Sequence, residues 1–208
     1  MIIGICGLIG SGKDTVASHL INNHNFVKIS FADKLKDAVA SMFDWDRNML
    51  EGQTAESRNW REKPDEFWTN EIGKDITPRL VLQRFGTECM RQGLYDGIWV
   101  SMAKKKILDN PDTNWIIPDV RFPNEVKMIK EIYGSVWRVT RGKDPQWFQH
   151  FKEEGVEPKS IHPSEYAWAN TDFDYFIQND STIDSLNTSV DDVISDLQQD
   201  HLVSSRAS

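Results

Sequence analysis

The stretch Ile2-Ile-Gly-Ile-Cys-Gly-Leu-Ile-Gly-Ser-Gly-Lys-Asp-Thr15 joins an apolar run to a glycine-rich segment that ends in a lysine. Residues Ile2–Cys6 are apolar except for one glycine, and they are short enough for a buried strand. Val16, Ala17 and Leu20 then follow at the spacing of an amphipathic helix. A strand, a glycine-rich loop and a helix N-terminus in this order are the setting of a phosphate-binding loop.

The loop keeps most of the phosphate-loop spacing, because Gly7 is followed after four residues by Gly12 and Lys13. The usual hydroxyl residue is replaced by Asp14, and Thr15 comes one position later. Glycines let backbone N–H groups turn toward phosphate oxygens, and Lys13 would reach the β- and γ-phosphates. The alternative is a glycine-rich turn with a surface lysine, which the flanking strand and helix disfavour. The magnesium ligand stays open between Thr15, Asp14 through water, and neither.

The composition fits one compact domain, with 208 residues of which 39% are hydrophobic and 27% charged. A net charge of −8 argues against binding nucleic acid or an anionic membrane as the main activity, although local arginines could still bind a nucleotide. Cys6 and Cys89 are predicted to be buried thiols rather than a disulfide. No signal peptide or long apolar run is recognisable, which predicts a soluble, cytoplasmic protein.

The rest of the chain predicts an α/β fold with irregular additions. Residues 25–31 suit a second strand and Asp33–Phe43 a helix, which favours a parallel sheet with ligands beyond the carboxyl ends of its strands. Segment 44–77 lacks a sustained apolar face, so it is either an insertion that folds over an acceptor nucleotide or a decorated surface loop. Residues 142–160 are predicted as a lid or an irregular excursion, and 201–208 as a flexible tail. Aromatic-rich helices between Pro78 and Leu108 make a homodimer plausible.

An acidic residue follows the next apolar run, where Trp115–Ile117 predicts a short buried strand and Asp119 falls at its carboxyl end. A carboxylate there can hold magnesium or its water shell, or orient a substrate hydroxyl. The alternative is a structural aspartate paired with Arg121. Further along, His162 and Glu165 could bind a metal, but Pro163 and the lack of a third ligand favour a role in capping or ordering the loop.

Several motifs in the same order resemble one known family, the bacteriophage deoxynucleoside monophosphate kinases. The resemblance covers most of the chain, although segment 44–77 and the excursion after Arg141 match poorly. The motifs are Ser11-Gly-Lys-Asp-Thr15, Ser30-Phe-Ala, Leu35-Lys36, Pro78-Arg79, Leu82-Gln83, Gly86-Thr87-Glu88, Trp99, Asp119-Val-Arg-Phe-Pro-Asn-Glu125, His162-Pro-Ser-Glu165 and Gln178-Asn-Asp180.

The resemblance implies a P-loop NTPase-type three-layer sandwich, with a mostly parallel sheet, helices on both faces, and insertions for a lid and the acceptor. It implies transfer of the γ-phosphoryl group of ATP, with Mg²⁺, to a deoxynucleoside 5′-monophosphate for DNA synthesis, in the cytoplasm of a bacterial host. ATP and the monophosphate are the expected partners, without nucleic acid or membrane. The residues expected to bind ATP are Gly10, Ser11, Gly12, Lys13, Asp14 and Thr15, with Thr15 as the metal ligand to test.

Chemistry and resemblance together assign roles to the other site residues. Two anions must be brought together, so cations are needed from several segments. Arg79 and Arg121 are expected at the acceptor phosphate, because a guanidinium fork matches phosphate geometry. Arg141 would close on the transferring group, and Asp119 would orient metal water or deoxyribose. Lys13, Asp119, Arg121 and Arg141 are therefore the predicted catalytic residues. The remaining predicted substrate contacts are Lys36, Gln83, Thr87, Glu88, Trp99 and Glu125, with Trp99 equally suited to a core.

Three alternatives follow from the same residues. A P-loop kinase could use another acceptor, such as dephospho-coenzyme A or a nucleoside. A switch GTPase is disfavoured, because neither Asp-x-x-Gly nor Asn-Lys-x-Asp occurs in the chain. A non-catalytic nucleotide-binding protein would require that Arg79, Asp119, Arg121 and Arg141 be dispersed.

Overall fold

The computed structural model describes residues 1–206, with side chains described as far as residue 199. The chain divides into two compact units, a larger unit of Met1–Ser30 and Ile107–Ser208 and a smaller unit of Phe31–Lys106. The smaller unit therefore begins before, and ends after, segment 44–77, where the sequence predicted an insertion. Each unit has its own hydrophobic core and is described by itself.

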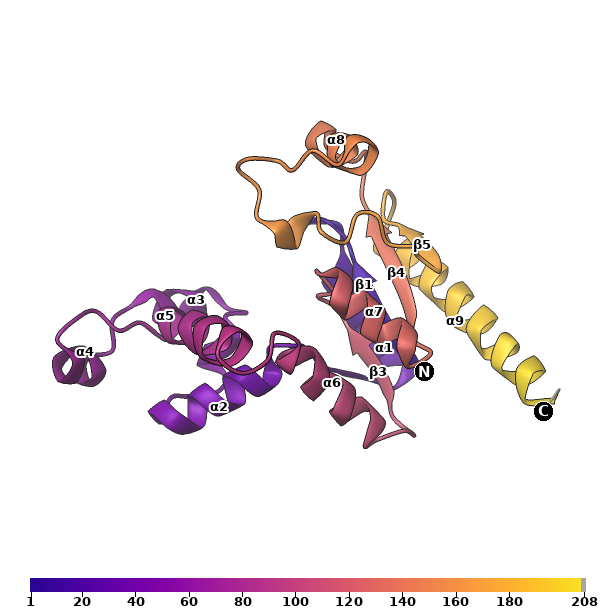
Figure 1. Cartoon of the computed structure of the whole chain (residues 1–208). Coiled ribbons are helices and arrows are strands. Elements are labelled where there is room, and N and C mark those ends of the chain that lie inside the picture. Colours follow the sequence, from indigo (N-terminus) through magenta and orange to yellow (C-terminus); the bar gives the residue numbers. More distant parts are fainter. Residues whose placement is uncertain (207–208) are drawn as a thin grey trace. The chain divides into compact units, whose positions relative to one another are not determined.

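The larger unit is built on a five-stranded parallel sheet with the order β2-β3-β1-β4-β5 (Figure 1). The first strand therefore lies at its centre, where Ile3 pairs with Ile116 of β3 and Gly4 with Val136 of β4. Because all strands are parallel, their carboxyl ends meet at one edge. The strands are β1 (Ile2–Cys6), β2 (Phe26–Lys28), β3 (Asn114–Ile117), β4 (Ser135–Thr140) and β5 (Tyr175–Gln178).

Helices cover both faces of this sheet, as predicted. Side chains alternate along a strand, and in β1 a Cβ on Gly4 would lie 2.5 Å from Ile129 of α7. Ile3 and Ile5 point to the other face, into a core shared with α1 and α9. That core also contains Val16, Leu20, Phe26, Ile116, Trp137, Val139, Ile177, Leu186, Val190 and Ile194. The helices of this unit are α1 (Lys13–His24), α7 (Pro123–Glu131), α8 (Gln146–Glu154), the short η3 (Pro163–Glu165) and α9 (Ile183–Arg206).

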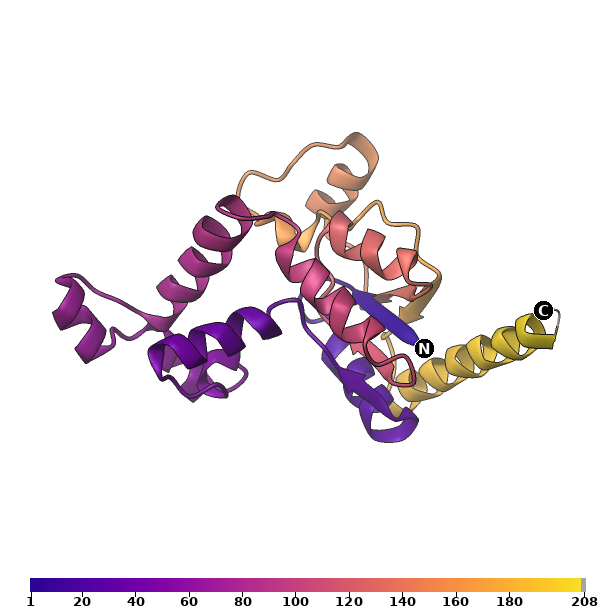
Figure 2. The same cartoon turned by 60° about the horizontal axis from the view of Figure 1, so that its bottom comes forward.

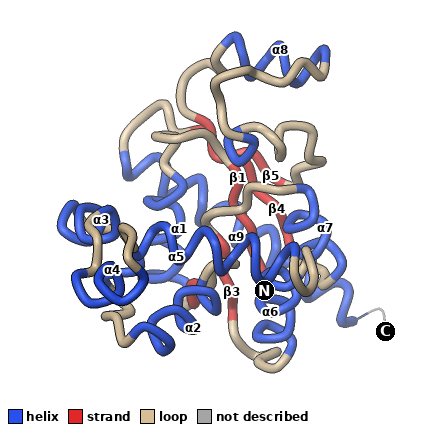
Figure 3. Tube along the Cα trace, turned by 60° about the vertical axis from the view of Figure 1, so that its left-hand side comes forward, coloured by secondary structure: helices blue, strands red, loops and turns tan. Residues whose placement is uncertain are grey.

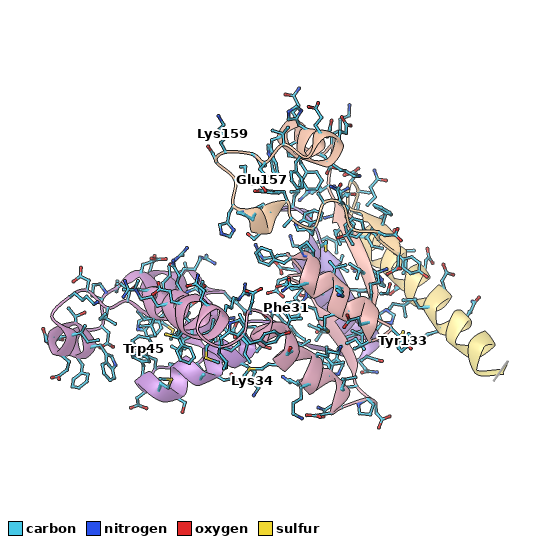
Figure 4. All side chains as sticks on the ribbon, viewed as in Figure 1. Phe31, Lys34, Trp45, Tyr133, Glu157 and Lys159 are labelled. Atoms are coloured by element: carbon cyan, nitrogen blue, oxygen red, sulfur yellow. The ribbon has the colours of Figure 1, made fainter. Side chains whose placement is uncertain are left out.

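The smaller unit is helical, and its core forms around Val39, Trp45 and Leu50. The Trp45 indole stacks on Phe43 with ring centres 4.7 Å apart, and its Nε1 donates to Asp65 at 2.9 Å. Figure 4 labels Trp45 among the side chains of this unit. The expected irregular segment 44–77 thus contains short helices, as the tube view in Figure 3 shows. Trp60 of this segment packs edge-on against Trp45. The elements of this part of the chain are α2 (Asp33–Phe43), η1 (Met49–Glu51), α3 (Ala55–Glu62), α4 (Glu66–Ile72), α5 (Pro78–Gln83), the π-helical η2 (Arg84–Gln92) and α6 (Ile98–Leu108).

The structure can be compared with three local expectations: the excursion at 142–160, the tail at 201–208 and the burial of the two cysteines. The excursion at 142–160 contains the helix α8, followed by irregular chain. The expected tail is helical as far as Arg206, as Figure 2 shows for α9, and residues 207–208 lie outside the described part. Cys6 is buried, but Cys89 is exposed, so the prediction for Cys89 was wrong. Among the described residues, no helix combines the length and the apolar character needed to cross a membrane.

Candidate phosphate-binding active site

The glycine loop joins β1 to α1, and its last glycine is required by both backbone and packing. Gly12 is the N-cap of α1 with φ of 105°, a left-handed conformation that favours glycine. A Cβ at Gly12 would lie 2.3 Å from Nδ2 of Asn179. That amide donates to the carbonyl of Ser11 at 2.9 Å, and the backbone N–H of Asn179 donates to Thr140 at 2.8 Å. The end of β5 therefore holds the loop in shape.

Lys13 lies across the loop that precedes it. Its ammonium donates to the carbonyls of Gly7 and Leu8 at 2.7 and 2.9 Å. Burial lowers the pKa of Lys13, and the nearby positive charge of Arg121 lowers it further, while Asp14 acts in the opposite direction. A phosphate beside Lys13 would offset the effects of burial and of Arg121, because its negative charge would pair with the ammonium and favour the charged form.

Several predicted catalytic residues line one small hollow at the carboxyl edge of the sheet. Lys13, Asp119 and Arg121 share it with Gly7, and Ser164, Glu165 and Trp168 complete its wall. Asp119 accepts a hydrogen bond from the hydroxyl of Ser30 at 3.0 Å, which orients one carboxylate oxygen. Nη1 of Arg121 donates to Glu165 at 3.0 Å, in a pair that is partly exposed. Two cations and two carboxylates from separate segments therefore meet beside the phosphate loop.

Glu125 supports this constellation from below. The side chain is buried, and its Oε2 accepts the backbone N–H groups of Arg121 at 2.7 Å and Phe122 at 3.1 Å. It stands at the third position of α7, where such a carboxylate caps the helix start. The structure therefore gives Glu125 the role of positioning Arg121 and does not favour the direct substrate contact that the sequence suggested.

A larger pocket of about 380 Å³ opens on the outer side of the loop. Arg141, which is exposed, stands at this pocket, so it lies near the loop as the sequence predicted. The pocket combines loop amides and a cation with apolar side chains from α9, a lining that suits a nucleotide. Its walls are Gly10, Gly12, Lys13, Asp14, Thr15, Arg141, Asn179, Ser181, Ile183 and Leu186. Ser11 is instead buried, with its Oγ lacking a hydrogen-bond partner among the described residues.

A second pocket, of about 330 Å³, lies along the other side of the loop and reaches the start of α8. Its floor holds Arg138, a buried side chain whose Nη2 contacts both carboxylate oxygens of Asp144 at 2.6 Å. The guanidinium also lies over the rings of Phe148 and Trp168, at 5.0 and 5.6 Å from their centres. This cluster fixes the segment after β4, where the sequence predicted a lid.

The remaining predicted substrate contacts belong to the smaller unit. Nζ of Lys36 contacts Glu51 at 2.7 Å, and the exposed Arg79 contacts Glu62 at 2.7 Å. Gln83, Thr87 and Glu88 are exposed along α5 and η2. Trp99 is different, because it is buried and its Nε1 donates to the carbonyl of Gly86 at 3.0 Å. Trp99 is therefore a core residue in this structure, which favours the core role over the base contact that the sequence left equally open.

Sequence reasoning missed Arg138, Asp144 and Asn179 as parts of the site. Arg138 is a charged residue inside an otherwise apolar strand, which is a signal that could have been used. Asn179 lies in a motif of the resemblance but received no role. Glu165 and His162 were expected to order a loop; His162 accepts the Ser164 backbone N–H, and Glu165 binds Arg121.

The fold and site together define the class of this protein. A parallel sheet of this order, with a glycine loop leading from the central strand into α1, is the architecture of the P-loop kinases and confirms the predicted fold. The chain belongs to the deoxynucleotide monophosphate kinase family, whose family model matches residues 62–190. It is accordingly a nucleotide kinase, an enzyme that transfers a phosphoryl group.

Two relatives show the extent of the match. A protein of Acanthamoeba polyphaga mimivirus, provisionally named a deoxynucleotide monophosphate kinase, is 30% identical over 202 residues, which cover 91% of this chain and 94% of the relative. The deoxynucleoside-5′-monophosphate kinase of Escherichia phage T5 is 44% identical over 57 residues, or 27% of this chain and 22% of the relative.

Solved structures are more distant. TT1252 from Thermus thermophilus is 14% identical and has a TM-score of 0.49, with 95% of this chain and 97% of that chain covered. Dephospho-CoA kinase from Campylobacter jejuni is also 14% identical and has a TM-score of 0.42, with 94% and 96% covered.

Proposed function

We propose that this protein transfers the γ-phosphoryl group of ATP to a deoxynucleoside 5′-monophosphate, which yields the deoxynucleoside diphosphate and ADP. The observation that carries the proposal is the convergence of Lys13, Asp119 and Arg121 on one hollow beside the glycine loop. Membership of the deoxynucleotide monophosphate kinase family supports the choice of acceptor.

The chemistry asks little of the protein in proton transfer, because an acceptor phosphate is already an anionic nucleophile. The main obstacle is the repulsion between two phosphate groups, so catalysis depends on position and charge. Lys13 would leave the carbonyls of Gly7 and Leu8 to bind the β- and γ-phosphates of ATP. Arg121, held by Glu165 and by its backbone bond to Glu125, would bind the acceptor phosphate or the group in transfer. Arg141 would add a further charge from the rim of the larger pocket.

Oxygen ligands beside the loop fit the Mg²⁺ that accompanies ATP. Thr15 and Asp14 line the same pocket as Lys13, and Asp119 presents an oriented carboxylate in the adjoining hollow. Mg²⁺ takes such oxygen ligands and keeps several waters. When bound, it neutralises charge on the β- and γ-phosphates. We propose Thr15 as its protein ligand, with Asp119 orienting a metal-bound water or the sugar of the acceptor.

Residues of the smaller unit are proposed for recognition of the acceptor. Arg79 is exposed and its present partner, Glu62, is exposed as well, so a phosphate could replace that carboxylate at little cost. Gln83, Thr87 and Glu88 offer hydrogen-bonding groups to a base. Lys36 is the weaker candidate, because Glu51 already holds it in a part-buried pair.

The test is a coupled assay of ADP release with ATP, Mg²⁺ and a panel of acceptors. The panel holds each deoxynucleoside monophosphate, its ribose counterpart and dephospho-coenzyme A. We expect ADP with one or more deoxynucleotides and none with Lys13→Ala, which should remain folded. Arg121→Ala should raise KM for the monophosphate and lower kcat. Turnover with dephospho-coenzyme A alone, or ATP binding without turnover of any acceptor, would reject the proposal.

A further inference from the structure

Two histidines and a carboxylate meet where α1 packs against α9 in the larger unit. Nε2 of His19 and Nε2 of His24 each lie 2.6 Å from the same oxygen, Oδ1 of Asp191. These three ligand-type atoms all lie within 4.8 Å of one another. His19 and His24 belong to the second half of α1, whereas the phosphate loop lies at its N-terminus. The cluster is therefore separate from the proposed kinase site.

The burial of the cluster differs from that of an ordinary surface ion pair. The side chains of His19 and His24 are 10% and 21% exposed, while Asp191 is 48% exposed. The imidazoles are thus held by the packing of two helices, and the carboxylate keeps the site open to solvent. An ion could enter from the side of Asp191 without unfolding either helix.

The donor set indicates which ion would bind. Two imidazole nitrogens and one carboxylate oxygen suit Zn²⁺ and similar late first-row divalent cations, whereas Mg²⁺ and Ca²⁺ prefer oxygen ligands throughout. Zn²⁺ with bonds of about 2.0–2.1 Å in a tetrahedral site keeps its ligands roughly 3.3 Å apart. Each histidine nitrogen would therefore move away from the Asp191 oxygen by only about 0.7 Å, which side-chain rotation can supply.

Asn23 supplies the outer contact that a zinc-binding histidine needs. Its side-chain amide lies 2.9 Å from Nδ1 of His19, on the ring side opposite the Asp191 contact. A histidine that binds metal through Nε2 normally donates its Nδ1–H to an oxygen. Turning the Asn23 amide over presents its Oδ1 to that N–H, because the amide carries an acceptor and a donor in nearly equivalent places.

A neighbouring residue on α9, Asn187, has a buried side-chain oxygen without a hydrogen-bond donor in the described part of the chain. Asn187 stands one helical turn before Asp191, on the same side of the helix. Its Oδ1 is buried and has no hydrogen-bond partner within the described side chains, residues 1–199. Buried polar atoms normally have partners, so this side of α9 lacks a hydrogen-bond donor that a bound water could supply.

We propose that His19, His24 and Asp191 bind Zn²⁺, or a chemically similar late first-row divalent cation, and that this ion fastens α1 to α9. The fourth position is taken by water, so the three protein ligands alone join the two helices. The clamp acts on the helix whose first residue, Lys13, belongs to the phosphate loop. It is independent of the proposed kinase reaction, because none of its three ligands lines the pockets beside the loop.

The experiment is a calorimetric titration of the full chain, without a histidine tag or nucleotide and after treatment with a chelator. We expect one equivalent of Zn²⁺ to bind, and Mg²⁺ not to compete for it. His24→Asn and Asp191→Asn should each weaken the binding of Zn²⁺ by about tenfold or more. The matched control is His150→Asn, which removes an exposed histidine paired with Glu154 and should leave the binding unchanged.

Thermal unfolding adds a readout that does not depend on activity. Zn²⁺ should raise the Tm of the wild-type chain and of His150→Asn, but not that of His24→Asn, because only a ligand of the folded state stabilises it. Circular dichroism establishes that each variant is folded; if Asp191→Asn is not, His24→Asn decides. No stoichiometric binding of Zn²⁺, or binding that His24→Asn leaves unchanged, would overturn the proposal and leave a hydrogen-bonded triad only.

Discussion

The side-chain amide of Asn179 donates to the backbone carbonyl of Ser11 at 2.9 Å, across 168 residues of sequence. The contact ties the end of β5 to the phosphate loop, and the same amide occupies the space that a Cβ on Gly12 would need. The shape of the loop is thus set by a residue far from it in the chain. Replacing Asn179 by a residue without a side-chain amide should therefore loosen the phosphate loop, although the sequence of the loop itself is unchanged.

Asn179→Ala should raise KM for ATP several-fold and lower stability by about 1 kcal/mol, the usual value of one hydrogen bond. The loop amides would then be less well ordered before the nucleotide binds. Steady-state kinetics and thermal unfolding measure the two effects. Gln178→Ala is the control, because Gln178 contacts Asp180 and not the loop. An unchanged KM for ATP in Asn179→Ala would show that the loop keeps its shape unaided.

Glu125→Ala should lower kcat strongly, although Glu125 itself touches no substrate in our proposal. Its carboxylate holds the backbone of Arg121 and Phe122, and its loss leaves two partly buried N–H groups without this acceptor, at a cost of about 2 kcal/mol. Glu125→Gln keeps one acceptor oxygen and should retain most of the activity and stability. If kcat is unchanged in Glu125→Ala, at a temperature where the variant is folded, then Glu125 is not needed to position Arg121 for the reaction.

The smaller unit should lose stability in acid through Glu51. Burial raises the pKa of Glu51, but hydrogen bonds from Lys36 and Arg47 outweigh it and hold the pKa below its ordinary value of 4.5. A lowered carboxyl pKa stabilises the folded state above the ordinary pKa, and this contribution is lost as the pH falls through the lowered value. The protection factors of amides in α2 and α3, which correct for the intrinsic dependence of exchange on pH, should therefore fall below about pH 4.5. Glu51→Gln should show fast exchange already at neutral pH and a weaker dependence on pH.

The sequence was sufficient for the sheet and the phosphate loop because both depend on local pattern. Apolar runs of strand length alternate with helical periodicity, and the spacing of Gly7, Gly12 and Lys13 occurs in one continuous segment. Asp119 and Arg121 could be placed near Lys13 because parallel strands bring their carboxyl ends to one edge. The structure places all three in one hollow.

The contacts that the sequence did not reveal depend on tertiary packing. Arg138 and Asp144 are six residues apart, but the aromatic rings over Arg138 come from Phe148 and Trp168 further along the chain. The side chain of Trp99 suits either a base pocket or a hydrophobic core, and only its burial in the structure favours the core. The helices of segment 44–77 could not be predicted for another reason: they are too short to show the periodic apolar pattern of a helix.

The cluster around Arg138 should control the order of the segment that follows β4. Arg138→Met removes one partner of a largely buried pair and leaves the Asp144 carboxylate without its guanidinium, so we expect a loss of about 2–4 kcal/mol in stability. Limited proteolysis within residues 142–160 should become faster. Adding Asp144→Leu removes the stranded charge, and the double variant should recover much of the lost stability. If the two changes prove additive in thermal unfolding, the pair is not coupled and the aromatic rings alone hold the segment.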